Sequence, residues 1–112
     1  MTFDLKPGQE ARPRGLGFGV KLEEVAEDSR CPQGVNCIWA GSVRVVLLLT
    51  VPGAEPVRAE VNTNRAPRAV RFEGHDVTLL RVLPPKVNGK DIAPGDYVIT
   101  LSVSKKSDTG TR

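Results

Sequence analysis

The feature of this sequence that most constrains its fold is an alternation of apolar and polar residues with a period of two. Apolar side chains occupy every second position from Leu16 to Leu22, and again from Tyr97 to Val103. Successive side chains of a strand point to opposite faces, so the pattern is typical of strands with one buried face. Strands are predicted at residues 2–6, 16–25, 42–51, 56–63, 69–73, 76–83 and 96–105. The core is predicted to contain Phe18, Val20, Leu22, Val45, Leu47, Leu79, Ile99 and Leu101.

Glycine and proline divide these apolar runs. The chain has eleven glycines and nine prolines, many of them between the runs, as turn residues lie in all-β chains. Residues 51–56, VPGAEP, are predicted to be a hairpin loop, and residues 87–90, VNGK, carry an Asn-Gly pair favoured in tight reversals. We predict one all-β domain over residues 1–104, an immunoglobulin-like or Greek-key β-sandwich of about seven strands, with a small β-barrel as the alternative. Residues 105–112 are predicted to be a frayed polar tail.

The two cysteines, Cys31 and Cys37, lie in one short segment, CPQGVNC. A redox pair favours two intervening residues at a helix start, and a structural zinc site needs about four ligands, whereas the only histidine is His75. A catalytic dyad of one cysteine with His75 stays compatible with this count. A disulfide explains more, because Pro32 and Gly34 let the chain turn back within bridging reach. We predict a structural disulfide that closes a crossover between two strands.

The only tryptophan follows the second cysteine by two residues. On an extended strand Trp39 and Cys37 would share a face, so we expect the indole to be largely buried against the disulfide. Gly41 would then leave room beside the ring.

Polar residues flanking this segment are assigned structural roles. Asp28 and Ser29 are expected to accept backbone N–H bonds of the turn, and Arg30 to pair with an acid among residues 23–28. Tyr97 follows a Pro-Gly turn at the start of the last predicted strand. This is the setting of a tyrosine corner, in which the phenol bonds an upstream backbone group, and a plain core tyrosine is the alternative.

A disulfide also implies an oxidising compartment outside the cytosol. No leader peptide is visible in the opening residues 1–9, MTFDLKPGQ, so we expect that a leader has been lost from this sequence. The predicted location is the periplasm or the cell surface.

The segment around the cysteines resembles a family motif. Residues 28–47, DSRCPQGVNCIWAGSVRVVL, are similar to the Asp-Ser-Arg-Cys-Pro and Cys-x-Trp-Ala-Gly motif of an uncharacterised family of small secreted or lipid-anchored bacterial proteins. The F-x-L-x-x-G-Q opening, Phe3 to Gln9, and the closing strand, Tyr97 to Lys105, resemble that family as well. The resemblance implies export and a β-sandwich, and it supplies no reaction and no catalytic residues.

Charge gives a weaker indication of function. A net charge of +3 and 4% aromatic residues do not favour nucleic acid, and no run is long and apolar enough to span a membrane. Arg65, Arg68 and Arg71 recur every three residues in NRAPRAVR. Arginine suits carboxylate and phosphate groups, so these residues are candidates for binding an anionic glycan, a lipid headgroup or an acidic protein. A solvated charged surface is the alternative.

Together these features predict a non-catalytic, exported binding or accessory module. Its partner is expected to be an unknown protein or an anionic envelope polymer, and the module itself to be a monomer without cofactor or metal. The alternative is a small envelope hydrolase or metal-handling protein. That alternative would require acids or His75 to converge in one pocket.

Overall fold

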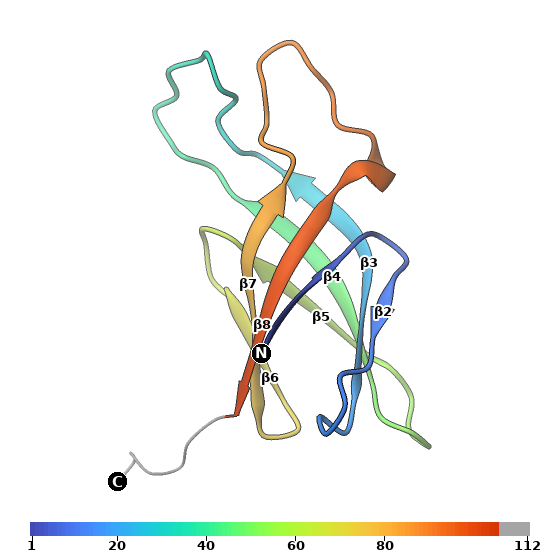
Figure 1. The fold of residues 1–112 in the computed structure, drawn as a ribbon. Coiled ribbons are helices and arrows are strands. Elements are labelled where there is room, and N and C mark those ends of the chain that lie inside the picture. The colour runs from blue at the N-terminus through green and yellow to red at the C-terminus, as the bar shows by residue number, and fades with distance from the viewer. Residues whose placement is uncertain (106–112) are drawn as a thin grey trace, which may run out of the picture.

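The computed structural model describes residues 1–105, and this part of the chain forms eight strands in two antiparallel four-stranded sheets (Figure 1). One sheet has the order β2 (Glu10–Ala11), β3 (Gly19–Asp28), β4 (Val43–Thr50) and β5 (Val57–Asn62). The other has the order β1 (Thr2–Leu5), β8 (Val98–Lys105), β7 (His75–Leu83) and β6 (Ala69–Phe72). A single 3₁₀ turn, Pro94–Asp96, precedes β8.

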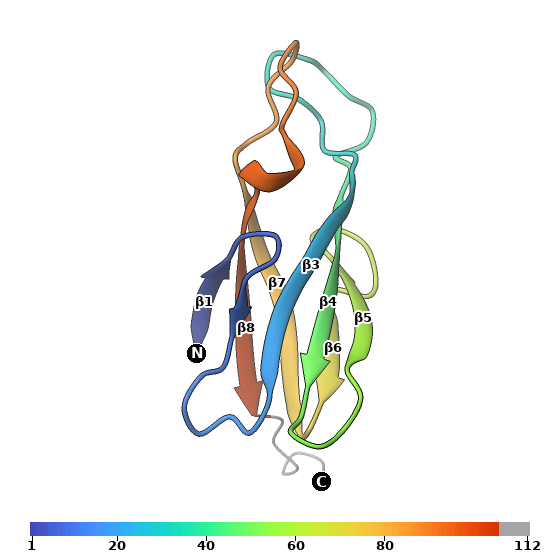
Figure 2. The same ribbon diagram turned by 90° about the vertical axis from the view of Figure 1, so that its right-hand side faces the viewer.

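The two sheets form the two layers of the sandwich, which Figure 2 shows from a second side. The predicted all-β sandwich is confirmed, with two open sheets rather than a closed barrel. The additional strand is β2, which pairs Glu10 with Lys21 and Ala11 with Val20. Two residues are too few to show an alternation, so the sequence carries no signal for this strand.

The core lies between the sheets, where the alternating apolar residues meet. All eight core residues predicted from the sequence are at most 2% exposed. The central strand β4, between β3 and β5, buries Val45, Val46 and Leu47 completely. Its neighbours on both edges and the facing sheet account for most of this burial, whereas Arg44, Leu48 and Thr50 of the same strand are only half-buried.

The alternation of buried and exposed residues is incomplete at the sheet margins. In β5 the apolar Val57 is 46% exposed, whereas the polar Asn62 is 4% exposed. Burial of Asn62 is compensated, because both its backbone N–H and its Nδ2 donate to the carbonyl of Pro67. In β3 the alternation stops after Leu22, where the pairing with β4 shifts register.

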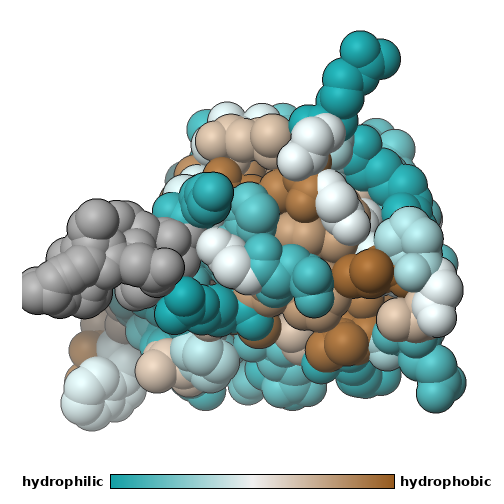
Figure 3. All heavy atoms as spheres, turned by 90° about the horizontal axis from the view of Figure 1, so that it is seen from below, coloured by the Kyte–Doolittle hydropathy of each residue, from teal (hydrophilic) through white to brown (hydrophobic). Residues whose placement is uncertain are grey.

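Two long connections leave the same end of the sandwich. Residues 29–42 join β3 to β4 in one sheet, and residues 84–97 join β7 to β8 in the other (Figure 1). Figure 3 shows the opposite end, where hydrophilic residues surround a group of hydrophobic ones. Within residues 1–105, no helix has the length and hydropathy needed to cross a membrane.

The predicted frayed tail, residues 105–112, begins at Lys105, which is the last residue of β8. Residues 106–112 lie outside the described part of the chain.

Candidate functional site

The connection between β3 and β4 is a hairpin extension closed by a disulfide. The Ser29 N–H donates to the Ser42 carbonyl at 2.8 Å, and the Cys31 N–H donates to the Ala40 carbonyl at 3.1 Å. Cys31 and Cys37 are bonded to each other with their Cα atoms 5.9 Å apart, which confirms the predicted disulfide. The bridge lies in a hairpin between two adjacent strands of one sheet, and not in the crossover that was predicted. We call residues 29–42 the stapled loop.

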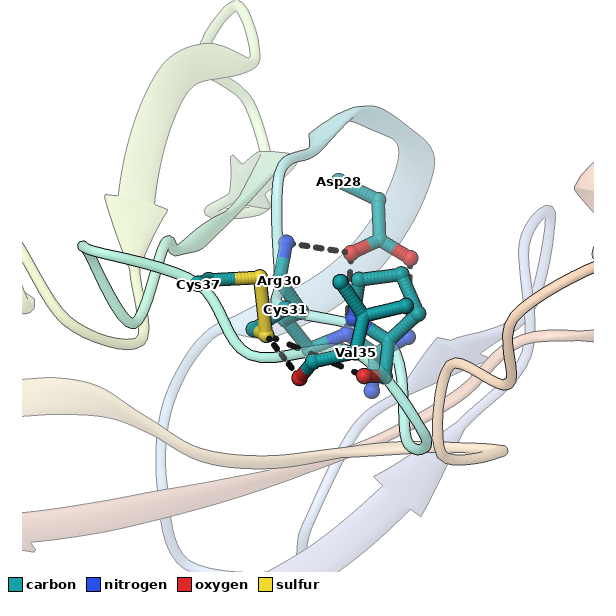
Figure 4. Close-up of a disulfide and its surroundings, with 6 residues drawn as sticks. Asp28, Arg30, Cys31, Val35 and Cys37 are labelled. Atoms are coloured by element: carbon teal, nitrogen blue, oxygen red, sulfur yellow. Dashed lines mark hydrogen bonds and ion pairs between the residues drawn. A yellow bond between two sulfur atoms is a disulfide. The ribbon is translucent and has the colours of Figure 1, made fainter.

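The first half of the stapled loop is a tight turn beneath the bridge (Figure 4). The Val35 N–H donates to the Pro32 carbonyl, and Gly34 has a positive φ of 90° at the turn position that favours glycine. The Val35 carbonyl oxygen lies 3.2 Å from Cys31 Sγ. A disulfide sulfur carries no proton, so this is a packing contact that closes the turn over the bridge.

The expected burial of Trp39 is wrong. Trp39 is 81% exposed and Ile38 is 91% exposed, more than any other large apolar side chain in the described part of the chain. The prediction assumed an extended strand after Cys37, but the backbone bends at these two residues and β4 begins only at Val43. With Val35, which is 39% exposed, they form the apolar tip of the stapled loop.

Gly41 has a different role from the one expected. Its φ is +75°, and a Cβ built there would overlap the Ser29 carbonyl oxygen. The missing side chain therefore makes room for the neighbouring backbone of the hairpin, and not for the indole of Trp39. Glycine is required at this position both by the left-handed φ and by the close approach.

The stapled loop is fastened to the second long connection, which comes from the other sheet. The Gln33 N–H donates to the Lys86 carbonyl at 2.8 Å, and the Asn88 N–H donates to the Gln33 carbonyl at 3.2 Å. These bonds accompany a parallel bridge between Gln33 and Val87. Lys86 Nζ also donates to the Asp28 carbonyl at 3.0 Å. Neither connection is therefore a free loop.

A polar cluster lies at the base of the stapled loop. Arg30 donates from Nε and Nη2 to the two carboxylate oxygens of Asp28, each at 2.8 Å, and from Nη1 to the Val82 carbonyl at 3.1 Å. The Tyr97 hydroxyl donates to the same carboxylate at 2.9 Å. Asp28 ends β3, Val82 belongs to β7, and Tyr97 precedes β8. The cluster therefore joins the two sheets where the long connections leave them.

This geometry corrects one expectation and refines another. Tyr97 is not a tyrosine corner, because its phenol bonds a side-chain carboxylate instead of an upstream backbone group. The expected partner of Arg30 among residues 23–28 is Asp28. As expected, Asp28 accepts a backbone N–H of the turn, that of Arg30, at 3.3 Å, and Ser29 Oγ accepts the Ser42 N–H at 3.0 Å.

The hydrogen bonds of the cluster fix the protonation states of Asp28 and Tyr97. Hydrogen bonds from Arg30, opposed by burial and assisted by Tyr97, lower the pKa of Asp28 to about 2. Burial, followed by the bond to Asp28, raises the pKa of Tyr97. At neutral pH the Asp28 carboxylate stays ionised, with both of its oxygens hydrogen-bonded, and Tyr97 stays protonated. Neither is poised to exchange a proton near neutral pH, as a general acid or base must do.

A hollow of about 300 Å³ adjoins this cluster and is lined by Asp28, Lys86, Lys90, Asp91, Ile92 and Tyr97. Two acids reach it, which is the convergence a hydrolase would need, but the Asp28 carboxylate is already occupied by Arg30 and Tyr97. His75 lies elsewhere, as the first residue of β7, with Nδ1 2.8 Å from the Glu73 carbonyl. The disulfide removes the thiol that a dyad with His75 would use.

Metal ligands do not gather in the described residues. No group of three or more histidine, cysteine, aspartate or glutamate side chains able to hold a metal ion occurs within residues 1–105.

The three predicted binding arginines are exposed and lie on different segments. Arg71 lies in β6, Arg68 precedes that strand, and Arg65 lies in the connection from β5. Among the described residues none of the three has a carboxylate within ion-pair distance. By contrast, Arg44 pairs with Glu27 and Glu60 on the outer face of the first sheet.

Arg65 is placed beside the apolar tip. The Asn64 N–H donates to Ser42 Oγ at 2.9 Å, and its Nδ2 donates to the Gly41 carbonyl at 3.0 Å. These bonds hold the β5–β6 connection against the stapled loop. Trp39 and Arg65 consequently line one hollow of about 230 Å³, together with Ala40, Gly41, Ser42 and Asn64.

Sequence reasoning missed the features that make this end of the molecule a candidate site. Exposure of Ile38 and Trp39 was not foreseen, although residues 31–43 contain no charged residue and Gly41 could have signalled a break before the strand. The pairing of Gln33 with the second connection has no sequence signal, because it joins irregular segments far apart in the chain.

No protein-family model, no curated protein and no solved structure matches this chain. The family resemblance of residues 28–47 therefore stays a prediction, and function is inferred from the geometry above.

Proposed function

We propose that this protein is a non-catalytic, exported binding or accessory module that attaches to a component of the cell envelope through its stapled loop. The observation that carries the proposal is the apolar tip. Ile38 and Trp39, more exposed than any other large apolar side chain described, are neighbours on a loop held by a disulfide and by bonds to a second loop. Isolated exposed apolar residues need no explanation, but a rigidly supported group of them marks an interaction surface.

Rigid support is what a binding loop needs. Ordering a flexible loop on binding costs free energy, and a loop already fixed by covalent and hydrogen bonds avoids that cost. Tryptophan and arginine are also the residues most enriched among those that dominate binding energy. Trp39 and Arg65 line one hollow, so an apolar contact and a charged contact are available at the same place.

Export is supported by the disulfide, which is stable in oxidising compartments and rare in the cytosol. The hydrolase or metal-handling alternative gains no support from the geometry, because Asp28 is held ionised by Arg30 and His75 lies apart from it.

Sedimentation with washed envelope fractions tests the proposal. We expect the wild-type protein to sediment with envelopes, and the Ile38→Ser/Trp39→Ser variant to remain in the supernatant. Val57→Ser is the matched control, because Val57 is 46% exposed and pairs with Leu49, near the end of β4 that lies away from the stapled loop. The proposal fails if the double variant sediments as well as the wild type does. Sedimentation of the Arg68→Gln/Arg71→Gln variant tests whether the two arginines outside the hollow contribute to envelope binding.

A further inference from the structure

The shape and composition of the apolar tip limit what can cover it. A stable protein–protein interface uses about 20–30 residues on each side. The tip offers only three large apolar side chains, Ile38 and Trp39 at a bend of the stapled loop and Val35 at the end of its tight turn. A protein partner would need a cleft shaped to receive this projection. A bilayer surface is soft and requires no matching cleft.

The charge distribution around the tip also favours a bilayer. Residues 31–43, between Arg30 and Arg44, carry no charge in a chain of which 26% is charged. No acid lines the hollow beside Trp39, where the single charged side chain is Arg65. Tryptophan and neighbouring apolar residues lie preferentially at the boundary between hydrocarbon and headgroups, and cations lie at the headgroup level.

Arg65 is free to receive a phosphate. Within residues 1–105 no carboxylate lies within 4 Å of its guanidinium, whereas Arg30 and Arg44 are each paired. Asn64 holds this segment through two hydrogen bonds to the stapled loop, and Arg65 lines the same hollow as Trp39. The guanidinium forms two parallel bonds to phosphate oxygens with little loss of freedom.

From these observations we infer that the stapled loop inserts its apolar tip into the interface of a bilayer containing anionic lipid, with Arg65 binding a lipid phosphate in the hollow beside Trp39. This inference rests on the proposed envelope attachment and names lipid as the component that is bound. The disulfide and the bonds of Gln33 to the second connection keep the tip extended before contact.

The chain contains a single tryptophan, so its emission reports directly on the tip. We would titrate the protein with vesicles of phosphatidylglycerol and phosphatidylethanolamine, and with vesicles of phosphatidylcholine alone. With the anionic vesicles, Trp39 emission should shift to shorter wavelength and be quenched by lipids brominated on the acyl chain. With phosphatidylcholine the shift should require much more lipid. Because the effect of Arg65 is electrostatic, raised salt should weaken the binding.

Substitutions separate the apolar contribution to membrane binding from the electrostatic one. Ile38→Ser keeps the fluorophore and should weaken partitioning roughly tenfold, because one large apolar side chain leaves the interface. Arg65→Gln should weaken it about fivefold on anionic vesicles only, the effect of one cation near such a surface. Leu80→Ser is the matched control, since Leu80 is 49% exposed on β7 and should leave partitioning unchanged.

Three outcomes would overturn the inference. If soluble glycerol phosphate alone saturates Arg65 and prevents vesicle binding, the ligand is a free phosphate. If no vesicle changes Trp39 emission while envelope sedimentation still depends on the tip, the partner is a protein or glycan and the proposed function stands. If neither vesicles nor envelopes bind, both proposals fail.

Discussion

Replacing Asp28 by asparagine tests whether the polar cluster fixes the base of the stapled loop. The carboxylate accepts a two-pronged bond from Arg30 and a third bond from Tyr97, and its side chain is only 9% exposed. Asparagine is nearly the same size, so it removes the charge without leaving a cavity. The Arg30 guanidinium, 19% exposed, would then lack its counter-ion.

The size of the effect follows from the pKa of Asp28, which is lowered from 3.8 to about 2. Such a difference between the folded and unfolded chain corresponds to about 2 kcal/mol of stability at neutral pH. Removing one partner of a fully buried pair costs about 3–5 kcal/mol, and this pair retains some contact with solvent. We therefore expect Asp28→Asn to lower the free energy of unfolding by about 2–3 kcal/mol at pH 7.

The same shift predicts the pH dependence. A carboxyl whose folded pKa is lowered stabilises the fold fully above its unfolded pKa and loses that contribution as pH falls toward the folded pKa. The stability gap between wild type and Asp28→Asn should therefore be constant above about pH 5 and shrink steadily between pH 5 and pH 2.

Urea unfolding at a series of pH values measures this gap. Asp91→Asn, an exposed acid at the edge of the same hollow, is the control and should leave stability within about 0.5 kcal/mol of wild type. A loss below about 0.5 kcal/mol in Asp28→Asn, or a gap that does not shrink at low pH, would refute the reasoning.

Three further outcomes follow from the same geometry. Replacing both Cys31 and Cys37 by serine should lower stability by about 2 kcal/mol while the far-ultraviolet spectrum stays that of a β-sandwich, because the closed loop is short. Gly41→Ala should cost more stability than Gly53→Ala in urea unfolding. Both glycines have positive φ, but a Cβ would overlap backbone only at Gly41. Tyr97→Phe should cost about 1.5–3 kcal/mol in the same assay, the loss of one hydrogen bond to a carboxylate.

The core and the sandwich could be predicted from the sequence because each depends on local alternation. Val20 and Leu22 are buried from β3, and Leu16 and Phe18 are buried as well, although they lie in the turn and bend that precede this strand. The disulfide could be predicted as well, since its formation depends only on a turn within a few residues.

The candidate site could not be predicted, because its arrangement depends on contacts between distant segments. Arg65 and Trp39 line one hollow because hydrogen bonds from Asn64 hold the β5–β6 connection against the stapled loop, and no periodicity encodes these bonds. Trp39 itself was misplaced, because the alternation rule was applied to a bent loop before β4 begins. The bond of Tyr97 to Asp28 likewise joins residues 69 positions apart.

The most direct test of the account is the accessibility of Trp39 to iodide, measured in the free protein and after addition of envelope membranes. The account predicts that quenching in the free protein approaches that of a free tryptophan derivative, and that membranes protect the indole. An indole already shielded in the free protein, or equally quenched with and without membranes, would contradict the claim that the apolar tip is the binding surface.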